Sequence, residues 1–450
     1  MKSRAESSSI PWAGEPSRRR MAELEEKFSG LAPEVVGRSV GRILADHAEK
    51  VDGNGIVLYA GTNAMSPMAR RFLGSALESR PSMGYPGEKY QTFLEHVEEL
   101  ETVVVDLARR AFRAEFAEVR VQSGTLANLA VYSTFAEPGD TIAVLPEAAG
   151  GHISHHGYGA PSIRGVEVVD LPYDVQRMNV DLVKLPEFVN RHDPKLMVVG
   201  ASLLLFPHPL ERIREISERA GAILVYDAAH VDGLISGGLF QQPLVEGADL
   251  ITSSTYKSLG GPSGGMILTN DPALAERVAG TVYPAMTANY NAGRLAALAV
   301  TLAESLRFGE DYARACIANA RELARSLEEE GFVVAGAGQG FTDSHHVGVD
   351  AYDFGGGDAA ARALAEAGIY LSGIGLPWQG ADEIYRGIRI GTQEITRRGM
   401  KPEHMVKIAG WMGDVLLRKQ NSALVNDRVR EFRREFTSYE YCFDDPGEDI

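Results

Sequence analysis

The chain has 450 residues, of which 44% are hydrophobic and 24% are charged, and its formal net charge is −16. This composition is typical of a globular protein large enough for two domains, and the negative charge argues against nucleic acid or an anionic membrane surface as a main partner. No run of about 18 apolar residues predicts a membrane span. The two cysteines make no metal motif or disulfide framework, and the polar N-terminus does not resemble a secretory signal, so we expect a cytoplasmic protein.

The first part of the chain, residues 1 to 55, is charged and partly helical, and we predict an N-terminal arm there. From residue 56 to 315, short runs rich in Val, Ile and Leu alternate with amphipathic segments, a pattern typical of a mostly parallel sheet covered on both faces. Seven such runs occur: AEVRVQS, DTIAVLP, VEVVDLP, KLMVVGAS, AILVYDAA, ADLITSS and GGMILTN. We therefore predict a large α/β domain with a seven-stranded sheet.

A long amphipathic segment, residues 292 to 330, leads into a smaller α/β portion. We place the small C-terminal domain at residues 316 to 420. The chain ends in YEYCFDDPGEDI, which is acidic and contains proline and glycine, so residues 421 to 450 are predicted to be a surface tail.

Polar residues follow several of the predicted strands, where open α/β sheets bind their ligands. Ser123, Gly124 and Thr125 lie between a strand and a helix, so their hydroxyls and backbone N–H groups could cradle a phosphate. An ordinary helix N-cap explains the same residues equally well. Ser202 stands at another strand end, after KLMVVGA.

Asp227 directly follows the apolar strand AILVY, and His230 comes three residues later. A carboxylate so close to the core needs a partner. Capping of the following segment is the simpler alternative.

The stretch ADLITSSTYKSLGGPSGGMIL places one lysine, Lys257, between two apolar runs. A phosphate cradle, a strand-end carboxylate and a strand-end lysine match the needs of pyridoxal 5′-phosphate. The carboxylate keeps the pyridine nitrogen protonated, and the lysine amine forms the imine. A nucleotide P-loop is a weaker explanation, because it needs glycine immediately before the lysine and here that residue is Tyr256.

TSSTYKSLGGPSGG resembles the cofactor-lysine signature of serine hydroxymethyltransferases. GYPGEKY, SGTLANLAVY, PGDTI, GGHISHHG, YDAAHVDGLI and GIRIGTQEITRRGM resemble that family in the same order, over about residues 55 to 415. The resemblance implies a fold-type I enzyme, with a large cofactor domain, a small C-terminal domain and active sites shared within a homodimer or a dimer of dimers.

The resemblance also implies roles for single residues. Lys257 carries the imine, Asp227 pairs with the pyridinium, and Arg389 binds the substrate carboxylate. The implied cofactor contacts are Ser123, Gly124 and Thr125 at the phosphate, Ser202 and His230 near the ring hydroxyl, Ser254 beside the lysine, and Asn289 near the partner subunit's phosphate.

The chain departs from that family at several positions. The catalytic glutamate before GYPG aligns with Met83, and the histidine that stacks on the ring aligns with Ala149, while the next family histidine is retained as His152. GFTDSHHV, TRRGM and YCFDD look closer to threonine transaldolases and α-methylserine aldolases, which work without folate.

We therefore expect a folate-independent aldol cleavage or transfer on a β-hydroxy-α-amino acid, releasing or accepting a small aldehyde. His152 is the expected proton handler, although it could merely pack near the ring. His152, His155 and His156 have no carboxylate or cysteine at ligand spacing, so no metal is expected.

Alternatives remain. These are a folate-dependent hydroxymethyltransferase acting on serine or α-methylserine, another reaction at Cα (racemisation, transamination or decarboxylation), and a degenerate protein that keeps only the fold.

Overall fold

A computed structural model describes residues 9–378, 385–445 and 447. The chain divides into two compact units, the first ending at Gly55 and the second beginning at Ile56. The first unit consists of α1 (Glu15–Phe28), α2 (Pro33–His47) and a short helical segment (Ala48–Gly53). Residues 1–8 of the predicted arm, 379–384 of the predicted small domain, and 446 and 448–450 of the predicted tail lie outside the described residues.

The second unit contains a mixed seven-stranded sheet. Its order is β2 (Phe116–Glu118), β10 (Gly265–Thr269), β9 (Leu250–Ser254), β8 (Ile223–Asp227), β7 (Leu196–Val199), β3 (Thr141–Val144) and β4 (Glu167–Asp170). Strands β9, β8, β7, β3 and β4 are parallel, whereas β10 runs antiparallel to both of its neighbours. The predicted fold class, a mostly parallel sheet of an α/β protein, is confirmed.

Strand β10 reverses direction because the chain between β9 and β10 is short. A parallel crossover needs about a dozen residues or more, usually including a helix. The connection, TYKSLGGPSG, is a turn instead. The lysine of this turn therefore lies directly at the carboxyl end of β9.

Both faces of the sheet are covered by helices. Because successive strand residues point to opposite faces, one strand contributes side chains to two cores. In β7, Met197 and Val199 pack into one core, and Leu196 and Val198 pack into another. The first core is completed by α4 (Glu95–Phe112), α7 (Leu185–His192), α8 (Leu210–Arg219), α9 (Asp232–Ser236) and the start of α11 (Ala292–Glu330). The second is completed by α5 (Gly124–Phe135), α6 (Ala160–Arg164) and α10 (Pro272–Gly280).

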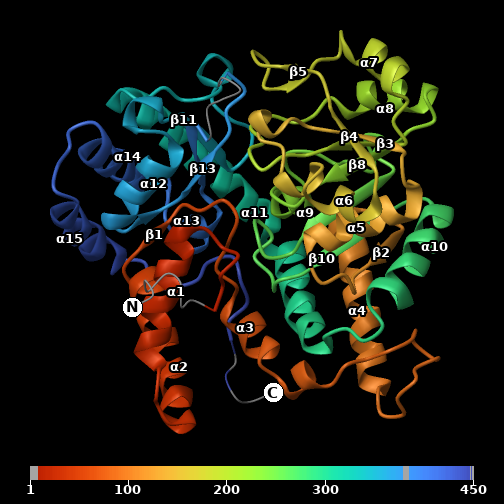
Figure 1. The fold of residues 1–450 in the computed structure, drawn as a ribbon, viewed down its shortest axis with the longest axis horizontal. Helices are drawn as coiled ribbons and strands as arrows, with labels where there is room; N and C mark the ends of the chain where they lie inside the picture. Colours follow the sequence, from red (N-terminus) through yellow and green to blue (C-terminus); the bar gives the residue numbers. More distant parts are fainter. Residues whose placement is uncertain (1–8, 379–384, 446, 448–450) are drawn as a thin grey trace. The chain divides into compact units, whose positions relative to one another are not determined.

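A further core surrounds a three-stranded sheet of β11 (His346–Asp350), β14 (Gly387–Gly391) and β13 (Ser372–Ile374). It also contains β1 (Ile56–Val57), β12 (Ile369–Tyr370), α12 (Gly357–Glu366), α13 (Gln393–Arg397), α14 (Pro402–Leu416) and α15 (Ser422–Arg433). In Figure 1, α12, α14 and α15 gather on one side of this unit and the seven-stranded sheet lies on the other.

The domain limits proposed from the sequence differ in part from these cores. The limit between residues 315 and 316 falls inside α11, which packs into the first core at Leu298 and into the three-stranded core at Leu323. The predicted tail begins with a helix, α15, whose Val425 and Val429 are fully buried in that same core. The apolar spacing of α15 therefore serves packing, and Phe436, which follows the helix, is buried in the same core.

The remaining described elements are short. They are α3 (Pro67–Leu73), the 3-10 helices η3 (Ala76–Ser79), η4 (Glu147–Ala149), η5 (Ile153–His155), η7 (Ala337–Gln339) and η8 (Tyr352–Phe354), the π-helix η6 (Thr281–Met286), and the strand pair β5 (Tyr173–Asp174) and β6 (Asn179–Val180). Among the residues that the structure describes, no helix combines the length and the apolar character that crossing a membrane requires.

Candidate active site

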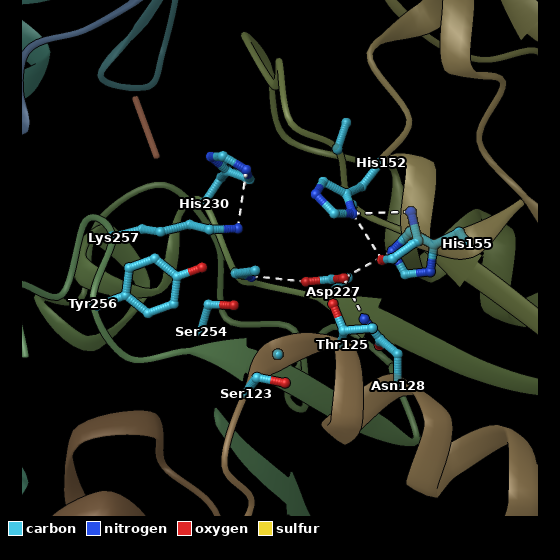
Figure 2. Close-up of a pocket in the computed structure, with 15 residues that line it drawn as sticks. Ser123, Thr125, Asn128, His152, His155, Asp227, His230, Ser254, Tyr256 and Lys257 are labelled. Carbon is cyan, nitrogen blue, oxygen red and sulfur yellow. Dashed lines mark hydrogen bonds and ion pairs between the residues drawn. The ribbon is translucent and has the colours of Figure 1, made fainter. Parts of the chain in front are cut away.

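A pocket lies at the carboxyl ends of the parallel strands, the edge where open α/β sheets bind ligands. Figure 2 shows the side chains that meet there from β8, β9, α5 and the loop after β3. The residues that line it are Ser123, Gly124, Thr125, Asn128, His152, Ser154, His155, Gly200, Ala201, Asp227, Ala229, His230, Ser254, Tyr256 and Lys257. Eight of these were predicted as site residues from the sequence.

The N-terminus of α5 forms one wall. Ser123 is the N-cap, and its hydroxyl accepts a hydrogen bond from the Leu126 N–H at 3.1 Å. Ser254 packs so closely that a Cβ on Gly124 would lie 2.0 Å from its hydroxyl oxygen, so only glycine fits. The cap and the phosphate cradle are therefore compatible: the capped helix end faces the pocket with its positive dipole and its free N–H groups.

Asp227, the last residue of β8, is buried and held by three donors. They are the Asn128 side-chain amide at 2.9 Å, His155 Nε2 at 2.8 Å and the Ala229 N–H at 2.9 Å. Burial alone would raise the pKa of this carboxyl. The hydrogen bond and charge of His155, the charge of Lys257 and the Ala229 N–H instead hold its pKa well below the ordinary range. Asp227 is therefore a fixed anion.

Asn128 and His155 were not recognised as site residues from the sequence. They lie 99 and 72 positions from Asp227. The sequence shows that a buried carboxylate needs hydrogen-bond partners, but it does not show which residues provide them. His155 Nδ1 in turn contacts the Tyr132 hydroxyl, and Asn128 accepts a hydrogen bond from Thr252 at 2.7 Å, so the partners are themselves held in place.

Lys257 lies in the turn after β9 and is 7% exposed. Its Nζ is 3.1 Å from His230 Nε2. Burial lowers the pKa of Lys257 to about 8, against the opposing charge of Asp227. Burial and the nearby lysine also hold the pKa of His230 well below its ordinary value, so His230 is neutral and accepts the hydrogen bond from the lysine. A lysine with a lowered pKa is a better nucleophile at neutral pH.

His152 lies above Asp227 in the view of Figure 2. Its hydrogen bonds define the tautomer of its ring. Its Nδ1 accepts a hydrogen bond from the Ser154 N–H at 3.2 Å and lies 2.7 Å from the Ser154 hydroxyl. A backbone N–H can only donate, so Nδ1 carries no proton. Burial and the charge of Lys257 lower the pKa of His152 to about 4, so the ring is neutral near pH 7. Its proton is therefore on Nε2, and His152 presents a hydrogen-bond donor.

His152 contributes an imidazole to the wall of the pocket. The sequence aligned Ala149 with the family's ring-stacking histidine and His152 with the next family histidine, which is retained. In the structure Ala149 ends the buried 3-10 helix η4, and the described residues lining the pocket include His152 but not Ala149. The wall of the pocket therefore includes the imidazole ring of His152.

Three predicted residues lie outside the lining of the pocket. Ser202 is buried just behind the wall formed by Gly200 and Ala201, and its carbonyl accepts a hydrogen bond from Arg389 Nη1 at 2.8 Å. Arg389, in the centre of β14, also donates to the Ser372 hydroxyl at 3.3 Å. Asn289 is exposed and accepts a hydrogen bond from Gln91 at 3.4 Å.

A family model described as serine hydroxymethyltransferase matches residues 38–412.

The chain belongs to the serine hydroxymethyltransferase family.

Within this family, the chain is similar to an α-methylserine aldolase from Ralstonia sp, with 41% identity over 96% of this chain and 98% of the relative. It is 44% identical to an α-methylserine aldolase from Variovorax paradoxus, over 90% and 92% of the two chains. It is 41% identical to a serine hydroxymethyltransferase from Pyrococcus horikoshii, over 88% and 94%.

Among solved structures, the chain is similar to L-threonine transaldolase from Pseudomonas fluorescens in its internal aldimine state. The TM-score is 0.83 at 27% identity, covering 94% of this chain and 96% of the other. The serine hydroxymethyltransferase-like chain thus has the fold-type I architecture, and the expected resemblance to an outlying, aldolase-like branch of the family is confirmed.

The pocket fits pyridoxal 5′-phosphate, the cofactor of this family. The capped end of α5 suits the phosphate, since glycine at position 124 leaves its N–H groups open. Asp227 is a buried, ionised partner for a protonated ring nitrogen, and Lys257 is a buried amine with a lowered pKa. When bound, the cofactor withdraws electrons from the Cα of an attached amino acid.

Proposed function

We propose that this chain catalyses the folate-independent aldol cleavage or transfer of β-hydroxy-α-amino acids, with α-methylserine as the first substrate to test. The observation that carries the proposal is the pocket in which Lys257, Asp227 and the donor tautomer of His152 converge. Similarity to two α-methylserine aldolases at 41% and 44% identity supports the choice of substrate. Similarity to a threonine transaldolase structure makes threonine the second substrate to test.

In this reaction the Cα–Cβ bond breaks, the proton of the β-hydroxyl passes to the protein, and the aldehyde leaves. Cα then takes a proton, which gives alanine from α-methylserine or glycine from threonine, or it adds to another aldehyde. We assign the Nε2–H of His152 to donate a hydrogen bond to the β-oxygen. Nζ of Lys257, when it is not bound to the cofactor, would be the nearby base. Arg389 binds the substrate carboxylate.

Folate independence is supported by the loop before α4. Met83 stands where a proton-handling glutamate is expected, and its side chain cannot carry a proton. Two carboxylates of α4 lie against this loop: Glu98 accepts a hydrogen bond from the Gly87 N–H at 2.9 Å, and Glu101 is buried in an ion pair with Lys89 and accepts a hydrogen bond from Ser82 at 3.4 Å. Glu101 is thus already engaged in holding the loop.

The test is to measure aldehyde release from α-methylserine and threonine with and without tetrahydrofolate. We expect release at a rate that tetrahydrofolate does not change. A rate that rises about 10²-fold or more with tetrahydrofolate would instead establish a hydroxymethyltransferase, the second candidate favoured by the Pyrococcus horikoshii relative. Consumption of the amino acid without aldehyde would point to racemisation, transamination or decarboxylation.

The assignment of His152 makes a separate prediction. His152→Gln keeps an N–H donor near the position of Nε2 but cannot accept a proton, whereas His152→Ala removes both. We expect His152→Gln to stay within about tenfold of the unaltered rate of aldehyde release and His152→Ala to lose about 10²-fold. His156→Gln, the same change in a half-buried neighbour, is the control. Equal, large losses in both His152 variants would show that His152 acts as a base.

We also propose that the chain assembles as a homodimer or a dimer of dimers. Support comes from apolar side chains that remain exposed in each unit: Tyr90 and Phe93 in the loop before α4, and Ile43 and Leu44 on α2. In this assembly we propose that Asn289 contacts the cofactor phosphate in the site of the partner subunit. Sedimentation should show a dimer or tetramer, and Asn289→Asp should weaken cofactor binding by charge repulsion. A fully active monomer contradicts this assembly.

A further inference from the structure

A second buried carboxylate, Asp232, lies beneath the lysine turn and has no part in the reaction described above. It opens α9, five residues after Asp227, and its side chain is inaccessible to solvent. Oδ2 accepts a hydrogen bond from the Ser253 hydroxyl at 2.7 Å. Oδ1 accepts from the Ser258 hydroxyl at 2.8 Å and from the Leu259 N–H at 3.1 Å. One carboxylate therefore binds the chain on both sides of Lys257.

The backbone beside Asp232 fits the same turn. The Gly233 N–H donates to the Ser258 hydroxyl at 3.0 Å, and a Cβ on Gly233 would lie 2.3 Å from the Ser258 carbonyl oxygen. Glycine is required for this close approach. On the other side of the turn, the Asn63 amide donates to the Ser258 carbonyl at 3.2 Å. The position of the lysine turn thus depends on α9.

The burial of Asp232 lowers the stability of the fold, and packing alone does not explain why a carboxyl group stands there. Burial raises its pKa to about 7, against the hydrogen bonds from Ser253 and Ser258. A buried acid whose pKa is raised destabilises the fold as the pH rises from the unfolded-state pKa toward that value. An apolar residue would fill the space without this cost. The carboxylate is therefore more consistent with a role in the site.

We propose that Asp232 is a positioning residue for Lys257: it holds the turn at both ends and supplies negative charge that favours the cationic form of the lysine nitrogen. This inference rests on the proposed function of Lys257 as the cofactor-binding amine.

The charge balance around the lysine supports this role. Apart from Asp232, the described titratable and charged groups around Lys257 are Asp227, His230, His152, His346, Arg389 and Tyr256. Burial holds all three histidines neutral, and Arg389 disfavours a cation at Nζ. The negative charges that oppose burial and Arg389 at Nζ are those of Asp227 and Asp232. Asp227 is already hydrogen-bonded to His155. Asp232 supplies the negative charge on the side of the lysine turn.

The experiment titrates the visible absorbance of the holoenzyme, whose colour reports the protonation of the lysine nitrogen bound to the cofactor. Asp232→Asn keeps the shape and one acceptor but removes the charge. We expect the midpoint of the pH titration to fall by about one unit, the size of effect that a nearby charge produces. A matched control is Asp249→Asn, which removes an acid that binds Arg214 and the Leu224 N–H next to the start of the same strand, β9. Its midpoint should not move.

An unchanged midpoint in folded, cofactor-loaded Asp232→Asn would overturn the proposal. If that variant does not fold, Ser253→Ala decides, because loss of one donor favours the protonated, uncharged form of Asp232 and should also lower the midpoint. An unchanged midpoint there would overturn the proposal in the same way. A wild-type protein that binds cofactor without any visible absorbance would count against the proposed function instead, so the two failures are distinguishable.

Discussion

Lys257→Ala is expected to abolish the visible absorbance of bound cofactor and to lower aldehyde release by at least about 10³-fold. In the proposed function, the amine is both the covalent attachment point and, when free, the base of the reaction. Folding should survive, because a buried amine whose pKa is lowered by burial contributes little to stability. Absorbance spectroscopy of the purified variant, followed by an aldehyde assay, checks both parts.

Lys257→Arg is the matched control for charge. Guanidinium keeps a cation beside His230 but cannot form the imine, so this variant should be as inactive as the alanine variant. In the unaltered enzyme, the rate should rise as the pH passes about 8, because Nζ of Lys257 then becomes neutral and can accept a proton. Retention of the wild-type spectrum in either variant would move the attachment point to another residue.

Arg389→Lys is expected to weaken amino-acid binding by about 10- to 100-fold while cofactor content stays nearly constant. The guanidinium is buried in β14 and is already oriented by Ser202 and Ser372, so its remaining N–H groups can meet a carboxylate in one geometry. A lysine has a single charged centre and cannot keep both the orienting hydrogen bonds and the carboxylate. Titration of the cofactor absorbance with glycine measures the affinity.

Arg386→Lys is the control for this change. Arg386 lies just before the same strand, but its Nε is paired with Asp350 at 2.8 Å, away from the pocket. Its replacement should leave the affinity for glycine unaltered. An unchanged affinity in Arg389→Lys would mean that another group binds the carboxylate, and Arg397 would be the next residue to test.

Local patterns in the sequence predicted much of this protein. The apolar run LMVV becomes a fully buried strand, β7, because a run without polar residues is stable only when both of its faces are covered. Asp227 ends β8, and Ser123 and Lys257 lie in the segments that follow β2 and β9; parallel strands bring their carboxyl ends to one edge of the sheet. The motifs around them also sufficed to name the family.

The tertiary structure decided what depends on partners distant in the chain. His155 and Asn128 reach Asp227 across 72 and 99 positions, and Asp232 reaches Ser258 across 26. No local spacing encodes such contacts, because folding sets them through the packing of separate elements. The tautomer of His152 depends on the backbone of the 3-10 helix η5, and α11 crosses the domain limit that its sequence suggested. Composition and motifs thus determined the fold class and the chemistry, while packing determined which groups are charged and which way each donates.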